Sequence, residues 1–160
     1  MNIRVVENDL YLPVLRELIA EGRDVRLNVR GYSMMPFLKD GRDSVMISKI
    51  NSKLKKGDIV IFQRKTGEFI MHRICRADEA GRQYYLVGDA QEIVEGPIEE
   101  KQIFGIITSA YRRKKWVKPG DMCWWFYEKV WGAMRPFRAK LLLGLLKARR
   151  LVKKVRCDIY

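Results

Sequence analysis

The sequence predicts a mainly β protein, built as a barrel or sandwich, with a short N-terminal helix and a basic C-terminal helical tail. Three observations predict this fold class. Short apolar runs follow one another with glycine turns between them, which is typical of all-β folds. One of these runs alternates between apolar and polar residues, as a half-buried strand does. The apolar fraction of 48% argues for a packed core and against disorder.

The N-terminal helix is predicted over residues 9–21, where Leu15 and Ile19 fall on one face and Gly22 would end the helix. The alternating run, residues 25–30, follows as the first strand. Five further strand candidates complete the body of the protein. They are residues 44–48, 57–63, 68–75, 83–87 and 103–110.

Charge divides the chain into two regions. Residues 1–110 contain 17 Lys/Arg and 16 Asp/Glu, whereas residues 111–160 contain 15 and 3. Nearly all of the net charge of +13 therefore lies in the C-terminal region. We predict a body over residues 1–112 and a basic, aromatic-rich tail over residues 113–160.

The tail is predicted to form two helical pieces, roughly 121–134 and 137–155, separated by Pro136. Three interpretations of the tail stay open. It could pack on the body as a solvated helical hairpin, it could meet an anionic membrane surface through residues 113–155, or it could bind nucleic acid. Aromatic and basic side chains suit the headgroup layer of an anionic bilayer. No recognised nucleic-acid motif interleaves these charges, which argues against nucleic acid as the partner.

The cysteines and the N-terminus indicate the compartment. Cys75, Cys123 and Cys157 are odd in number and form no Cys-x-x-Cys pair, which argues against a disulfide framework and a zinc cluster. The sequence shows no signal peptide and no run of about 18 apolar residues. We expect a cytoplasmic protein, with peripheral membrane contact as an option, that uses no metal and no cofactor.

Three short clusters contain residues suited to catalysis. In the first, residues 31–36, Ser33 follows a predicted strand and a glycine turn. The second lies inside a predicted strand and contains His72, the one histidine of the chain. The third is the Gly-Asp-Ala turn at residues 88–90. A serine hydroxyl becomes a nucleophile when a neighbouring base takes its proton, and histidine titrates near neutrality.

These clusters, with Gly-Asp-Ile-Val-x-Phe at residues 57–62 and Ile-x-Gly at residues 103–105, stand in the order of the motifs of type I signal peptidases. The sequence resembles this family, within the wider peptidase S24/S26 grouping that includes the LexA-type self-cleaving repressors, over about residues 25–110. Each motif alone is weak, whereas five in the right order are specific. The resemblance implies a signal peptidase/LexA-like β-barrel-type catalytic domain with serine endopeptidase activity.

The resemblance also implies roles for single residues. Ser33 would be the nucleophile and His72 the general base, as in the histidine-type branch of the family. The third member of a triad would orient the imidazole. Asp89 in the Gly-Asp turn and Glu95, which stands where the branch usually has a second aspartate, are equal candidates for it.

The oxyanion hole of this family uses the backbone N–H of the nucleophile. Some members add a serine two residues earlier, where this chain has Gly31. Loss of one such donor can reduce the rate by about 10²–10³-fold. Met34 follows the nucleophile and is expected to touch the substrate, an extended peptide that would pair with an exposed strand edge.

The sequence therefore predicts a serine endopeptidase that cleaves a peptide or protein precursor, or a leader segment. The alternative is a non-catalytic peptide-binding or membrane-associated module on the same fold. Gly31 and Glu95, which depart from the family pattern, motivate this alternative.

Overall fold

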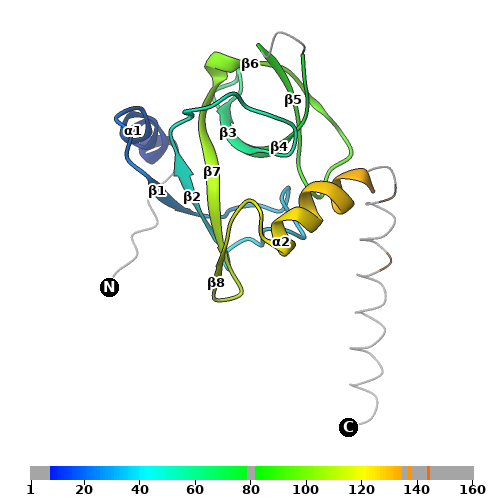
Figure 1. Cartoon of the computed structure of the whole chain (residues 1–160). Helices are drawn as coiled ribbons and strands as arrows, with labels where there is room; N and C mark the ends of the chain where they lie inside the picture. The colour runs from blue at the N-terminus through cyan, green and yellow to red at the C-terminus, as the bar shows by residue number, and fades with distance from the viewer. Residues whose placement is uncertain (1–7, 79–81, 135–136, 138–143, 145–160) are drawn as a thin grey trace, which may run out of the picture.

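The computed structural model describes residues 8–78, 82–134, 137 and 144. Its main feature is an antiparallel sheet of eight strands that curls into a barrel-like body (Figure 1). The elements in chain order are α1 (Asn8–Ala20), β1 (Val25–Asn28), β2 (Ser44–Ser48), β3 (Ile59–Gln63), β4 (Phe69–Ala77), β5 (Gln83–Val87), β6 (Glu95–Glu99), the 3-10 turn η1 (Glu100–Gln102), β7 (Ile103–Arg112), β8 (Lys115–Val117), α2 (Met122–Trp125) and the π-helical segment η2 (Phe126–Trp131).

The strands follow the order β1-β2-β7-β3-β4-β5-β6, and β8 pairs with β7. The mainly β fold predicted from the sequence is confirmed. The predicted N-terminal helix and six predicted strands are present with small shifts of their ends. Two strands were not predicted. β6 contains Gly96 and Pro97 between glutamates, which an edge strand tolerates, and β8 has only three residues.

Apolar side chains form two buried clusters. One joins α1 to β1, β2 and the loop between them and includes Leu15 and Phe37, and the other includes Phe62 and Tyr84. Trp124 of α2 is 2% exposed and belongs to the first cluster, so the segment after residue 112 packs on the sheet as far as η2. α2 and η2 run along the lower side of the body (Figure 1).

Nearly all of the second predicted helical piece, residues 137–155, and Cys157 lie outside the described residues. The division into a body and a tail at residue 112 stays a prediction. Among the helices of the described segments, none combines the length and the apolar character needed to cross a membrane.

Candidate active site

Ser33 lies in the turn that follows β1, where its side chain is half-buried. Gly31 enters this turn with a φ of +82°, and its N–H donates to Asp40 Oδ1 at 3.1 Å. The carbonyl of Ser33 accepts a hydrogen bond of 2.8 Å from the N–H of Ala90. This backbone hydrogen bond therefore joins the Ser33 turn to the turn that follows β5.

Gly88 brings Ser33 and His72 to the same face of the sheet. Val87 of β5 pairs with Arg73 of β4, so Gly88 takes the next register position, opposite His72. A Cβ added at Gly88 would lie 2.6 Å from the Ser33 carbonyl oxygen and 3.1 Å from its Cβ. Because cross-strand partners point to the same face, the side chain of His72 projects toward the side on which Ser33 sits. Only glycine at position 88 allows the Ser33 turn to pack this closely on the end of β5.

His72 is 1% exposed and packs beside the ring of Phe62. Its Nδ1 lies 3.3 Å from Oε1 of Glu95, and this buried nitrogen makes no hydrogen bond. Burial lowers the pKa of His72 from 6.5 to about 4, although the Glu95 carboxylate opposes this shift. The imidazole is therefore neutral at neutral pH and can accept a proton.

The two candidate carboxylates have different surroundings. Both oxygens of Asp89 accept hydrogen bonds from Arg73, at 2.9 and 2.8 Å, and both side chains are buried. A third Arg73 nitrogen donates to the carbonyl of Gly57 at 2.9 Å. The carboxylate that approaches His72 Nδ1 is that of Glu95. The alternatives that the sequence left equal thus differ in geometry, and the structure places Glu95 beside the imidazole.

Arg64 is a residue of this site that the sequence analysis missed. Its Nε donates to Glu95 Oε2 at 2.7 Å and its Nη2 to Oε1 at 2.5 Å. This hydrogen-bonded pair is the largest cause that lowers the pKa of Glu95, against burial. The sequence gave no signal for it, because the contact joins positions 31 residues apart and no motif includes Arg64.

The other predicted site residues have clear positions. No atom lies within 4 Å of a Cβ added at Gly31, so a side chain would have space there but would be strained by the positive φ. Met34 is 2% exposed and lies in the first core cluster, so it offers little surface to a substrate in this structure. Among the described residues, neither the N–H nor the Oγ of Ser33 makes a hydrogen bond, so the serine and the histidine are not hydrogen-bonded. Such contacts often tighten only when a substrate binds.

The segment after residue 120 braces both turns of the site. The indole N–H of Trp131 donates to the carbonyl of Asp89 at 2.7 Å. Phe37, which follows Ser33, packs against the rings of Trp124 and Tyr127 at 5.2 and 5.0 Å between centroids. The helical segment α2–η2 therefore holds the Ser33 turn and the Asp89 turn together.

A groove of about 110 Å³ lies between β1 and the start of β4. Its lining is mostly apolar and consists of Leu27, Asn28, Val29, Arg30, Val45, Ile61, Phe69 and Met71. β1 leads into the Ser33 turn, but Met71 and its neighbour His72 point to opposite faces of β4, and neither Ser33 nor His72 lines this groove. In the part of the chain that the structure describes, no three His, Cys, Asp or Glu side chains gather in a way that could hold a metal ion.

The structure is a curled antiparallel sheet with the Ser33 turn packed on Gly88, which lies opposite His72 in the register. The chain belongs to the Peptidase S24-like family, because the family model matches residues 2–108, more than half of the chain. This match includes the four candidate residues Ser33, His72, Asp89 and Glu95. A comparison with curated proteins found no significant match.

Proposed function

We propose that the protein is a serine endopeptidase that resembles signal peptidase and cleaves a peptide precursor or leader segment on the cytoplasmic side of the membrane. The observation that carries this proposal is the close packing of the Ser33 turn on Gly88, on the face of the sheet toward which His72 projects. His72 is buried beside Glu95 and is neutral at neutral pH. A neutral base on the same face as a serine is what acyl transfer requires.

Each residue would have a separate role in the acyl-transfer reaction. His72 takes the proton of Ser33 Oγ while this oxygen attacks the carbonyl carbon of the substrate. The oxyanion that forms would receive the N–H of Ser33, which donates to no other group in the described residues. Glu95 would stabilise the imidazolium, which then gives its proton to the leaving amine. Water attacks the acyl ester in the second half of the reaction, with His72 again as base.

The substrate would be an extended peptide. β1 is an edge strand of the sheet, and an edge can pair with an added strand through backbone hydrogen bonds. The groove beside β1 has a volume of about 110 Å³ and a mostly apolar lining. It would accept an apolar side chain of a peptide that pairs with β1.

Peptide cleavage followed by mass spectrometry tests this proposal. The wild-type protein, Ser33→Ala and Ser52→Ala are incubated with a mixed peptide library. Ser52 is an exposed loop serine and serves as the matched control. We expect the same cuts from the wild type and Ser52→Ala and none from Ser33→Ala. Cuts that persist in Ser33→Ala would contradict Ser33 as the nucleophile.

A non-catalytic peptide-binding module is the second candidate. The absence of a hydrogen bond between Ser33 and His72 within the described residues favours it, as does the lack of a side-chain donor at Gly31. Fluorescence anisotropy with labelled library peptides separates the two functions. Peptides that bind the wild type and Ser33→Ala equally and stay intact in both would support the binding module.

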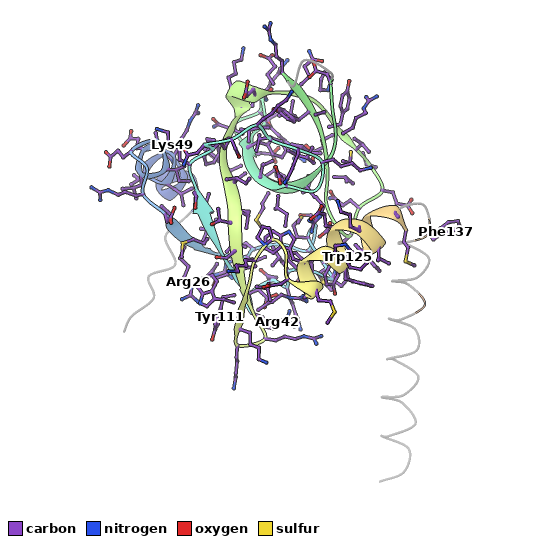
Figure 2. All side chains as sticks on the ribbon, in the orientation of Figure 1. Arg26, Arg42, Lys49, Tyr111, Trp125 and Phe137 are labelled. Atoms are coloured by element: carbon purple, nitrogen blue, oxygen red, sulfur yellow. The ribbon has the colours of Figure 1, made fainter. Side chains whose placement is uncertain are left out.

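We further propose that the helical segment α2–η2 rests on an anionic membrane surface. Met122, Trp125 and Phe126 are 84%, 52% and 42% exposed, and their spacing of three and four residues places them on one face. Trp124 and Trp131 on the other face are buried. Figure 2 labels Trp125 on this helix. Exposed basic residues precede this face in the chain, namely Arg113, Lys114, Lys115 and Lys118. Aromatic and basic residues together suit an anionic interface.

Co-sedimentation with vesicles tests the membrane proposal. The probe is a phosphatidylglycerol/phosphatidylcholine vesicle, with pure phosphatidylcholine for comparison. The double variant Trp125→Ser/Phe126→Ser should bind the anionic vesicles at least about tenfold more weakly than the wild type, since burying each ring contributes on the order of 1.5–3 kcal/mol. Ile93→Ser removes an exposed apolar residue elsewhere and should bind as the wild type does. Equal binding by the double variant would contradict this use of the helix.

A further inference from the structure

Arg64 stands behind the candidate orienting residue and does not belong to any motif of the sequence. Its guanidinium donates two hydrogen bonds to Glu95, so both oxygens of this carboxylate accept a hydrogen bond from Arg64. One of the two oxygens, Oε1, is also the atom that approaches His72 Nδ1 at 3.3 Å. Arg64 and His72 therefore share a single oxygen of Glu95.

The turn between β3 and β4 fixes the position of Arg64. The N–H of Arg64 donates to the carbonyl of Glu68 at 2.8 Å, and the N–H of Gly67 donates back to the carbonyl of Arg64 at 2.9 Å. The side chain of Glu68 also accepts a hydrogen bond of 3.0 Å from Arg64 Nη1. The planar guanidinium is thus held at both ends, which suits a two-point grip on a carboxylate.

We propose that Arg64 is a positioning residue of the active site, which holds Glu95 beside His72 and sets how strongly this carboxylate acts on the imidazole. The proposal rests on the proposed function for its catalytic meaning. Arg64 does not itself meet the reacting atoms. It acts through Oε1 of Glu95, which accepts a hydrogen bond from Arg64 and also approaches His72 Nδ1, a buried nitrogen that makes no hydrogen bond.

The charges around His72 give the direction of the effect. Glu95 and, more weakly, Asp89 raise the pKa of His72, whereas the Arg64 cation lowers it in addition to burial. Removing Arg64 would delete a nearby cation and release Glu95 toward Nδ1. Both changes favour the imidazolium, so they raise the pKa of His72. Removing the charge of Glu95 has the opposite sign.

Nuclear magnetic resonance of the single histidine tests the inference without any need for turnover. The Cε1–H signal of His72 is titrated in the wild type, Arg64→Gln, Glu95→Gln and Lys65→Gln. Lys65 is the exposed neighbour of Arg64 and provides the same loss of one positive charge. We expect Arg64→Gln to raise the pKa of His72 by about one unit, Glu95→Gln to lower it, and Lys65→Gln to leave it unchanged. Equal titration in Arg64→Gln and Lys65→Gln, or a lower pKa in Arg64→Gln, would overturn the proposal.

Arg64→Lys separates charge from geometry. Lysine keeps the cation but cannot form the two parallel bonds, so the pKa of His72 should stay closer to the wild type than in Arg64→Gln. In the cleavage assay its kcat should fall while KM is kept, because Arg64 does not contact the substrate. A KM effect with unchanged kcat would overturn the positioning role. If no variant and no wild type cleaves any peptide, the proposed function fails, while the titrations still decide the role of Arg64.

Discussion

The neighbours His72 and Arg73 on β4 point to opposite faces of the sheet, and each reaches a carboxylate from the segment that follows β5. On one face, Arg73 uses three nitrogens, two on Asp89 and one on the carbonyl of Gly57, and its guanidinium lies over the ring of Phe37. On the other face, Nδ1 of His72 lies 3.3 Å from Oε1 of Glu95 but makes no hydrogen bond.

The difference teaches which carboxylate is structural and which is suited to chemistry. A buried polar network that is fully satisfied rigidifies the structure. The Arg73–Asp89 pair therefore fixes the turn of residues 88–90 on β4. The histidine on the other face has an unused nitrogen and a shared carboxylate, so it can gain a proton and a hydrogen bond during a reaction. Adjacent positions on one strand thus serve two purposes.

The largest effect is expected on the His72 face. Ser33→Ala and His72→Ala should each reduce kcat by at least about 10³-fold, because each removes one member of a unit that transfers a proton. The double variant should be only slightly worse than either single variant, since the losses are not additive. Single-turnover cleavage of the best library peptide provides the rates. Losses that multiply in the double variant would show that the two residues act separately.

The two carboxylates should contribute differently, Asp89 mainly to stability and Glu95 mainly to activity. Asp89→Asn leaves the buried Arg73 cation without its partner and should reduce the free energy of unfolding by roughly 3–5 kcal/mol. Glu95→Gln should change it by less than about 1 kcal/mol, because the pair with Arg64 is partly exposed, while kcat falls by on the order of 10²-fold or more.

Urea unfolding followed by tryptophan fluorescence measures both free energies. The double variant Arg73→Met/Asp89→Leu is the control, because it replaces the ion pair by apolar side chains and should recover much of the stability. If Glu95→Gln proves the more destabilising of the two single variants, the assignment of a structural and a chemical face is wrong.

Gly88 lies opposite His72 in the register and directly precedes Asp89. Its replacement should reduce stability less than Asp89→Asn does. In Gly88→Ala the new methyl group would meet the Ser33 carbonyl at 2.6 Å, so the Ser33 turn must move away from residue 88. We expect a loss of about 1–3 kcal/mol in stability and a larger relative loss of kcat. In the control Gly67→Ala, the replaced glycine has a positive φ, so some stability is lost, but nothing lies within 4 Å of its Cβ and the wild-type kcat should be kept. Equal kcat losses in the two variants would argue against close approach at Gly88.

The sequence could predict the fold, which is confirmed, and candidates for the site, which stay predictions, because both depend on local patterns. Periodicity and glycine turns predict most strands, and the order of short motifs picks out Ser33 and His72. The choice between Asp89 and Glu95 was beyond the sequence, since it depends on which face of the sheet each loop residue reaches. Arg64 was missed for a related reason, because its contact with Glu95 exists only after β3 and the start of β6 have been brought together.

The smallest expected effect is the pH dependence of stability, which only the His72 face should show near neutrality. Burial lowers the pKa of His72 to about 4 in the folded state, against about 6.5 in the unfolded chain. Between these values the unfolded state binds more protons, so stability rises with pH, is fully present above about pH 6.5 and is lost as pH falls toward 4. From pH 7 to 5.5 the loss should be about 1 kcal/mol.

Urea unfolding at both pH values measures this loss, with His72→Asn as the control that lacks the titrating group and should lose less. The same low pKa predicts that kcat/KM stays level from about pH 5 to 8 and falls only as the imidazole protonates below this range. If kcat/KM instead fell with an apparent pKa near 6.5, His72 would titrate as an exposed histidine does. The burial that distinguishes its face from that of Arg73 would then not be maintained in solution.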